Sequence, residues 1–441
     1  MRLSWHDLGT PRADRAHGKT LEVVGWPTAS LGIARSDYFV LTAEASCCAG
    51  CVPNNPLAVI EVFADTELDL SGGVLRLTGT LHVETGDPLQ WRYQLRGAKP
   101  VAGLKRRALL AASPLFCLPT TVMAQTDGMA VDLHSHAGNL IRAVYGRDSL
   151  LDVAGPMTKG GMSAICLCIV GDSPVIGSSS GRIRPNRNPR PGELYDFSKT
   201  QFTKLHELAR TQSMPIIKTA ADLRAARAGR PSIIVTSEGA DWLDGKIERL
   251  DEAYQRWQLR QLQLTHYRPN ELGDIQTEPS EKGGLTDFGA EVIRRCNALG
   301  IVVDVAHGTF DLVKRAVATT TKPLILSHTA LSDRPYPWTR LITTDHARAI
   351  ASTGGVVGIW PVQDVPNVSS YAEAFFRMVA AIGVDHVGIG TDQLGLLGPS
   401  SMPSYGDLPQ LAAALRRKFN DADVAKLLGG NYRRVFEACV A

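Results

Sequence analysis

The sequence lacks a strong net charge, a dense cysteine pattern and any internal repeat. Its 47 Lys and Arg residues nearly balance 44 Asp and Glu residues, giving a formal net charge of +3. This balance offers no electrostatic case for a nucleic-acid partner. Eight cysteines in 441 residues are too few for a disulfide scaffold. What remains is a globular composition, with 44% hydrophobic residues, in a chain long enough for one large and one small domain.

The most informative stretch is Val131–His136, in which an apolar run leads into two histidines spaced one residue apart. On a strand, residues two apart point to the same side. His134 and His136 at the end of a strand could therefore aim both rings at one point, which suits a divalent transition metal such as zinc. An isolated His-x-His is more often a pair of solvated loop histidines, so the interpretation depends on the rest of the chain.

The first hundred residues predict a small β-rich domain, because short strand-like runs alternate with Gly, Pro, Asn and Asp turns. Three cysteines, Cys47, Cys48 and Cys51, lie within five positions of this region. A thiolate metal or redox site is one interpretation, but no second Cys or His cluster nearby completes four ligands. Ordinary or paired thiols in a loop are the simpler interpretation. The predicted strands are 39–41, 58–63, 74–83 and 89–95.

A segment typical of a secretory signal follows, with basic residues at 105–107 and an uncharged run over 108–124 that ends in small residues. The twin arginine also hints at the Tat route. Signals belong at an N-terminus and this one is internal. The chain could be a fusion with a retained export segment, translation could start near Leu104, or the segment could be a membrane anchor.

The anchor is the weaker interpretation, because Pro114 and Pro119 interrupt a run shorter than the roughly 20 residues of a spanning helix. A linker or a buried helix is the remaining alternative. We expect the C-terminal part to be periplasmic or otherwise exported, and cytoplasmic if the segment is only a linker. Any membrane association would involve residues 108–124, and a homodimer is compatible with the sequence.

From residue 130 onward, apolar strand-like runs alternate with helix-like stretches. This rhythm predicts a (β/α)8 barrel, with a doubly wound open sheet as the alternative. The predicted organisation is therefore a β-rich domain over 1–100, a signal-like linker over 101–128 and a barrel over 129–441. The predicted strands are 130–133, 164–170, 232–236, 261–265, 301–305, 323–327, 355–359 and 387–390, and the main predicted helices are 196–211, 246–256, 287–299, 309–318 and 371–382.

Polar side chains follow six of these strands, and barrel chemistry occurs at the C-terminal ends of strands. Each alone has an ordinary interpretation, such as a loop cap for Glu238, a satisfied core histidine for His266, or a helix N-cap for Asp392. A single metal-type ligand after a strand can easily arise by chance. The same coincidence at six strand ends is much less expected. The set is His134, His136, Glu238, His266, Asp304, His307, His328 and Asp392.

At these residues the chain resembles the membrane (renal) dipeptidase family of zinc metallopeptidases, which have amidohydrolase-like barrels. The resemblance covers residues 131–436. It is carried by the motifs Asp-Leu-His-Ser-His (132–136), Ser-Glu-Gly (237–239), Leu-Thr-His (264–266), Asp-Val-Ala-His (304–307), Ser-His-Thr (327–329) and Gly-Ile-Gly-Thr-Asp (388–392), and by the closing segment 429–436.

The resemblance implies two zinc ions bridged by Glu238, with a metal-bridging hydroxide that cleaves the peptide bond of dipeptides. His134 and His136 would bind the first ion, and His307 and His328 the second. His266 would face the substrate carbonyl and Asp392 would be the acid/base. Arg340 would hold the substrate carboxylate, with Arg334 as a competitor.

One departure from the family's pattern is His136, where the family usually has Asp. An imidazole in place of a carboxylate adds about one positive unit to the site. This change puts the substrate and the metal preference in doubt more than the reaction class.

Two alternatives stay open beside the dipeptidase prediction. The same site could serve a related metal-dependent amidohydrolase acting on N-acyl amino acids or cyclic amides. A non-catalytic, metal-containing exported binding protein is an alternative of another class, although a complete ligand set argues against it.

Overall fold

The computed structural model describes residues 5–8, 11–28, 35–43, 59–70, 74–83, 93–101, 128–138, 151–179, 182–332, 339–362, 367–396 and 400–440. Contacts divide these residues into two compact units, one up to residue 101 and one from residue 128 onward. Cys47, Cys48 and Cys51, the signal-like segment over 104–124 and Arg334 lie outside the described residues. No helix among the described residues has the length and apolar character needed to cross a membrane.

The first unit is a small closed barrel, which confirms the predicted β-rich N-terminal region. Its strands follow the order β1-β2-β3-β5-β4, and β1 pairs with β4 to close the barrel. Strand β1 was not among the predicted strands. It contains Gly25 and Pro27, which are residues typical of turns. A Cβ at Gly25 would lie 2.7 Å from the carbonyl oxygen of Thr42, so glycine permits this close approach of two strands. The elements are η1 (Trp5–Asp7), α1 (Pro11–Asp14), β1 (Thr20–Thr28), β2 (Arg35–Thr42), β3 (Val59–Asp69), β4 (Leu75–Val83) and β5 (Tyr93–Pro100).

The second unit is a closed barrel of eight parallel strands, as predicted. The strands neighbour one another in chain order, and β15 pairs with β6 through Ile389 and Asp132. This closure rules out the alternative of an open sheet. All eight strands form where expected, although β11 begins two residues earlier. They are β6 (Val131–Ser135), β7 (Ala164–Val170), β10 (Ser232–Glu238), β11 (Leu259–Gln263), β12 (Val302–Asp304), β13 (Leu324–Thr329), β14 (Val356–Ile359) and β15 (Val387–Ile389).

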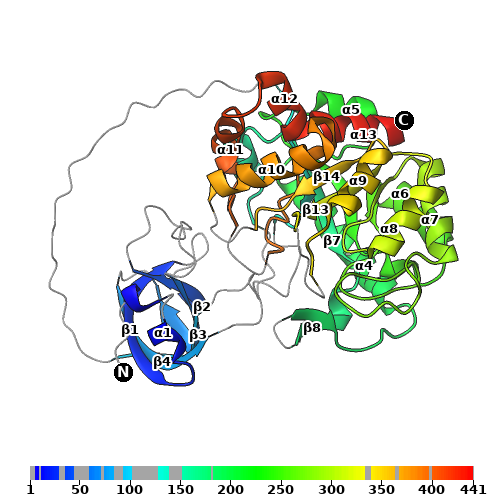
Figure 1. The fold of residues 1–441 in the computed structure, drawn as a ribbon. Coiled ribbons are helices and arrows are strands. Elements are labelled where there is room, and N and C mark those ends of the chain that lie inside the picture. Colours follow the sequence, from blue (N-terminus) through cyan, green and yellow to red (C-terminus); the bar gives the residue numbers. More distant parts are fainter. Residues whose placement is uncertain are drawn as a thin grey trace. The chain divides into compact units, whose positions relative to one another are not determined.

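Helices surround these strands (Figure 1). Four helices are capped at their N-termini by a side chain that accepts a hydrogen bond from the backbone amide three residues ahead, which satisfies a donor that the helix leaves free. The capping residues are Thr286, Thr309, Thr343 and Asn367. The α-helices are α3 (Ala154–Gly160), α4 (Glu193–Thr211), α5 (Ala220–Ala225), α6 (Glu248–Arg256), α7 (Asp287–Leu299), α8 (Phe310–Thr319), α9 (Thr344–Ser352), α10 (Val368–Ile382), α11 (Leu408–Leu415), α12 (Asp421–Ala425) and α13 (Asn431–Cys439).

Helix α13 closes one end of the barrel. It contacts β6, β12, β14 and β15, and Tyr432 donates a hydrogen bond to Gln261 near the start of β11. Tyr432 also accepts from the thiol of Cys166 in β7. The N-terminal ends of the strands are thus filled by side chains, and the opposite ends are left to carry polar groups. Cys166, Cys168 and Cys296 are buried free thiols, as predicted.

Shorter elements follow several of the strands. A hairpin of β8 (Ile176–Ser179) and β9 (Arg182–Pro185) comes after β7 and is antiparallel. Arg184 of this hairpin makes a two-pronged ion pair with Glu278, at 2.7 Å on both sides. The remaining short elements are η3 (Ser173–Val175), η4 (Asp241–Leu243), η5 (Val384–His386), η6 (Tyr405–Asp407) and the π-helical turn η7 (Lys426–Gly430).

Candidate metal centre

The C-terminal ends of the barrel strands bring the predicted ligands together. The donor atoms form three overlapping groups, in each of which all atoms lie within 4.8 Å of one another. All members are buried. Of the residues predicted for the site, only Arg334 lies outside the described residues. The groups are His134 with Glu238 and His328, His134 with His136 and Asp392, and Glu238 with His266 and His307.

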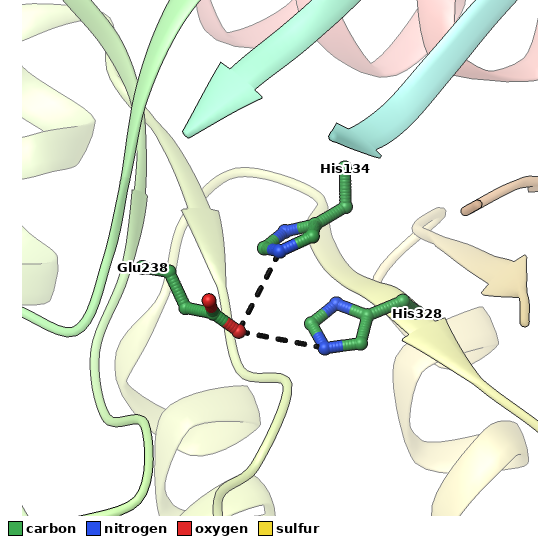
Figure 2. Close-up of side chains that lie close together, drawn as sticks. All are labelled: His134, Glu238 and His328. Atoms are coloured by element: carbon green, nitrogen blue, oxygen red, sulfur yellow. Dashed lines mark ion pairs between the residues drawn. The ribbon is translucent and has the colours of Figure 1, made fainter. Parts of the chain in front are cut away.

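Glu238, the last residue of β10, has ring nitrogens on both sides of its carboxylate. Figure 2 shows the carboxylate facing the rings of His134 and His328. Its Oε1 lies 3.5 Å from Nε2 of His134, 3.1 Å from that of His307 and 3.6 Å from that of His328. Its Oε2 lies 3.0 Å from Nε2 of His136. One carboxylate therefore faces ring nitrogens that come from β6, β13 and the segment after β12.

His134, His136 and Asp392 form one side of the centre. The Asp392 Oδ1 lies 3.4 Å from Nε2 of His136 and 3.8 Å from that of His134. Backbone hydrogen bonds hold the two segments together, since the Asp392 amide donates to the His134 carbonyl and the His136 amide to that of Gln393. A Cβ at Gly395 would lie only 2.0 Å from Asp392 Oδ1 and 2.6 Å from Cδ2 of His136. Glycine at 395 therefore leaves the space that these two side chains occupy.

His307 and His328 form the other side, with their Nε2 atoms 3.2 Å apart. His307 has a φ of +68° and Asp392 a φ of +49°, in the left-handed region that residues other than glycine seldom adopt. Such strained backbone is concentrated at functional sites. Burial lowers the pKa of both histidines well below the usual value, and the charge of Arg340 contributes in each case. Both rings are therefore neutral, which is the form that binds a metal.

Asp132 ties the first and last strands of the barrel together. Its carboxylate accepts from the amides of His134 and Thr391 and from the hydroxyls of Thr391 and Tyr405. Burial raises the pKa of Asp132 to about 6, against four hydrogen bonds that lower it. This one side chain fixes the backbone that carries His134 relative to the backbone that carries Asp392.

Arg340 lies beside the second pair of histidines. Its Nη2 donates to Nε2 of His328 at 2.9 Å, and its Nη1 donates to Oε1 of Gln276 at 3.1 Å. Arg340 is 5% exposed, and its guanidinium carbon lies 5.8 Å from the centre of the Trp360 ring. Among the described residues, no carboxylate forms an ion pair with it. A buried cation with only neutral partners is suited to receive an anionic group of a ligand.

Sequence reasoning missed two contributions, from the ends of β7 and β14. Asp172, two residues past β7, accepts from Nδ1 of His266 at 2.7 Å. Trp360, directly past β14, lies near both Arg340 and His328. All eight strand ends thus face the centre. The Asp two residues beyond an apolar run was the available signal for Asp172, but a Val-Gly-Asp sequence is equally typical of a plain turn.

The residues present fit a pair of divalent transition-metal ions. Four imidazole Nε2 atoms and two carboxylates converge in a buried space, a donor set that zinc prefers. His134 and His136 direct their Nε2 atoms to within 3.1 Å of each other, as do His307 and His328. Two such converging pairs with Glu238 between them match two ions sharing one carboxylate.

Comparison with known proteins agrees with this geometry. The family model for membrane dipeptidase, peptidase family M19, matches residues 194–440, more than half of the chain. The chain belongs to the membrane dipeptidase family. A relative from Klebsiella pneumoniae, an uncharacterized protein in the pqqA 5' region, is 26% identical over 282 residues, covering 56% of this chain and 97% of the relative.

Solved structures of similar proteins have the same fold. The dipeptidase AC, a metallo peptidase of family M19, is 21% identical with a TM-score of 0.60, covering 71% of this chain and 98% of that chain. A metallo peptidase from Rhodobacter sphaeroides, liganded with a phosphinate mimic of the dipeptide L-Ala-D-Ala, is 20% identical with a TM-score of 0.59, covering 71% and 100%. At these identities the structures show the barrel fold.

His136 gives this membrane dipeptidase family member a site with one imidazole more than the resemblance leads us to expect. Burial by itself lowers the pKa of His136, but the hydrogen bond and charge of Glu238 and the charge of Asp392 outweigh it and raise the pKa. The ring lies 1% exposed, directly against both carboxylates. Position 136 thus points into the centre and is not a surface substitution.

Proposed function

We propose that the barrel is a binuclear zinc dipeptidase in which Glu238 bridges the two ions. The observation that carries the proposal is the position of Glu238, whose two oxygens lie within 3.6 Å of ring nitrogens of four histidines from three strand ends. Burial raises the pKa of Glu238, but the charges of His266 and His134 outweigh it and lower the pKa well below the usual value. The group is therefore a carboxylate, as a bridge between two cations requires.

His134 and His136 would hold the first ion, and His307 and His328 the second. When bound, two zinc ions supply Lewis acidity that makes water a nucleophile at neutral pH and polarises the scissile carbonyl. A peptide bond is a poor electrophile, so this chemistry is what the reaction needs.

Asp392 would take the proton of the attacking water and deliver it to the leaving amine. Burial raises the pKa of Asp392 to about 7, although the charge of His136 lowers it. A carboxyl group near neutral pKa can both accept and return a proton at working pH. Its Oδ1 lies beside His134 and His136.

His266 and Arg340 would orient the substrate. Nε2 of His266 lies 3.3 Å from Glu238 and would donate to the oxygen of the scissile carbonyl as negative charge develops there. The guanidinium of Arg340 would bind the carboxylate of the C-terminal residue with two parallel hydrogen bonds. A carboxylate bound beside His328 would leave room for one residue after the scissile bond, as in a dipeptide.

The central test compares two buried glutamates. Glu238→Gln keeps the shape but removes the bridging charge, so kcat on a dipeptide panel is expected to fall by about 1,000-fold or more and zinc content to fall from two per chain. Glu278→Gln is the matched control, because Glu278 is also buried but pairs with Arg184. A Glu238→Gln protein that keeps wild-type turnover with zinc present would show the bridging role to be wrong.

The substrate panel separates the remaining alternatives. N-acyl amino acids are assayed beside dipeptides on the same zinc-loaded protein. Faster turnover of the N-acyl compounds would assign the site to an amidohydrolase of that class. Two zinc ions without hydrolysis of either class would favour a binding protein.

A further inference from the structure

Arg340 makes two side-chain hydrogen bonds, and only one of them competes with a metal ion. Nη2 donates to Nε2 of His328 at 2.9 Å, and Nη1 donates to Oε1 of Gln276 at 3.1 Å. The lone pair of the His328 nitrogen is the one that would bind the second ion, so the first bond and that ion exclude each other. Gln276 is not one of the proposed ligands. It is therefore the partner that Arg340 can keep in the zinc-loaded protein.

The side-chain amide of Gln276 has one orientation that suits both of its neighbours. Nε2 donates to the carbonyl oxygen of Leu341 at 3.2 Å, and a carbonyl oxygen can only accept. A guanidinium can only donate, so Oε1 must face Arg340. The backbone amide of Gln276 also donates to the carbonyl oxygen of His307 at 2.8 Å. Gln276 thus offers Arg340 an acceptor at a fixed position.

The backbone of Arg340 is held as well, so this residue is fixed at both ends. The hydroxyl of Thr329, the last residue of β13, donates to the carbonyl oxygen of Arg340 at 2.9 Å. The guanidinium carbon lies 5.8 Å from the centre of the Trp360 ring. With these contacts in place, the bond to Gln276 determines how the planar guanidinium is turned.

The neutrality of Gln276 matters as much as its position. A buried charge needs a partner, and a carboxylate at this place would pair with the guanidinium and compete with a carboxylate of the substrate. An amide oxygen accepts the hydrogen bond without neutralising the charge. The charge of Arg340 is thus left for the ligand, together with N–H donors for both oxygens of a carboxylate.

We propose that Gln276 is a positioning residue that makes the site select substrates with a free C-terminal carboxylate. It holds Nη1 of Arg340 in place, so that Nη2, once released from His328, donates to the substrate carboxylate. Without this anchor the guanidinium would turn away, and a free acid would lose its advantage over a C-terminal amide. This inference rests on the proposed hydrolase function of the same site.

Gln276→Leu removes the acceptor with little change in volume. We expect KM for a dipeptide to rise by about 10-fold, the usual effect of losing a hydrogen bond to a charged group, while kcat changes by less than about threefold. KM for the C-terminal amide of the same dipeptide should not change. Gln212→Leu is the matched control, because the side chain of Gln212 bonds to backbone atoms of residues 151–154. A purely structural role predicts equal losses for the free acid and the amide, and that result would overturn the proposal.

A double-mutant cycle tests whether Gln276 acts through Arg340. Two residues that serve one interaction are non-additive, so Gln276→Leu should raise KM by less than about twofold in the Arg340→Met background. Additive losses would mean that Gln276 supports substrate binding without Arg340, and the proposal would then be wrong.

A binding measurement does not depend on turnover. Zinc-loaded protein is titrated calorimetrically with alanine, which has the carboxylate of a C-terminal residue, and with alaninamide, which lacks it. We expect Gln276→Leu to bind alanine about 10-fold more weakly than the wild type and Gln212→Leu do, with no difference for alaninamide. Alanine that binds equally to wild type and Gln276→Leu, or to neither, would overturn the proposal. If the wild type hydrolyses no dipeptide, the proposed function fails, and the alanine titration still decides the role of Gln276.

Discussion

Arg340 donates a hydrogen bond from Nη2 to Nε2 of His328 at 2.9 Å. Because a guanidinium has no acceptor, the lone pair of Nε2 must receive this bond. The proton of His328 therefore lies on Nδ1, which faces the hydroxyl of Ser327 at 2.9 Å. This one contact fixes the tautomer of a candidate ligand. The same lone pair cannot serve a guanidinium and an ion at once, so Arg340 would have to leave Nε2 when the second ion binds and could then meet the substrate carboxylate.

We predict that Arg340→Met lowers kcat/KM for dipeptides by about 100-fold, mainly through a higher KM. A bidentate, charge-assisted contact with the substrate carboxylate contributes roughly 3 kcal/mol at a buried site. Steady-state kinetics on a dipeptide and on its C-terminal amide measures this loss. Arg334→Met is the matched control and should be close to wild type. If the wild type hydrolyses the amide as fast as the free acid, Arg340 does not bind the carboxylate.

A methyl group at position 395 should disturb the centre without unfolding the barrel. The added Cβ of Gly395→Ala would lie 2.0 Å from Asp392 Oδ1, so the carboxylate must turn away. We expect kcat to fall by about 100-fold, as for loss of a general acid/base, and the first zinc ion to bind more weakly. Kinetics and elemental analysis measure the two effects. Gly128→Ala is the control, since its Cβ would meet the nearest atom at 3.6 Å, and equal losses in both variants would count against the prediction.

Removing zinc should lower the melting temperature of the barrel. A ligand present at 1,000 times its dissociation constant stabilises the folded state by about 4 kcal/mol, which corresponds to a shift of about 6 °C for a domain of this size. Calorimetry with zinc and with a chelator measures the shift. Glu238→Gln should show a smaller shift, because it lacks the bridging ligand. If the melting temperature of the wild type is the same with zinc and with a chelator, the proposed metal centre is wrong.

His346 on α9 should make the barrel sensitive to acid. Burial lowers its pKa to about 4, and its ring packs against Phe310 at 4.7 Å. The folded-state pKa of His346 lies below the unfolded value of about 6.5. The free energy of unfolding therefore has its full value above pH 6.5 and falls as pH decreases towards 4, because the unfolded chain binds the proton first. The free energy of unfolding should fall by about 2 kcal/mol more between pH 7 and pH 5 in the wild type than in His346→Leu.

Urea unfolding of both proteins at the two pH values measures this difference. Both are kept in chelator, so that release of metal ions does not contribute. Other titrating groups are shared and cancel in the comparison. Parallel pH profiles for wild type and His346→Leu would contradict the assignment.

The barrel and most of its centre could be predicted because both follow local rules. Each strand is an apolar run in the sequence, and the C-terminal ends of parallel strands meet at one end of a barrel. A polar residue just past such a run, as at Glu238 or His328, is therefore placed by secondary structure alone. Pairing of β15 with β6 then brings Asp392 beside His134 without further information.

The rest depends on tertiary contacts that have no local pattern. Asp172 follows a strand, but only the path of the segment after β11 brings His266 to its side. Arg340 lies 12 residues past His328 in the chain, and the resemblance rather than the spacing pointed to it. Strand β1 was missed because Gly25 and Pro27 are turn residues by propensity, and barrel closure with β4 overrides that preference.

The link from Asp132 of β6 to Thr391 beyond β15 has a consequence for biosynthesis. The first part of the centre leaves the ribosome some 250 residues before Asp392 does. A nascent chain that has released only β6 to β14 can neither close the barrel nor complete the pocket around His134. Completion of the centre is therefore a late step of folding, and a chain that ends before β15 would lack both the barrel closure and the acid/base proposed at Asp392.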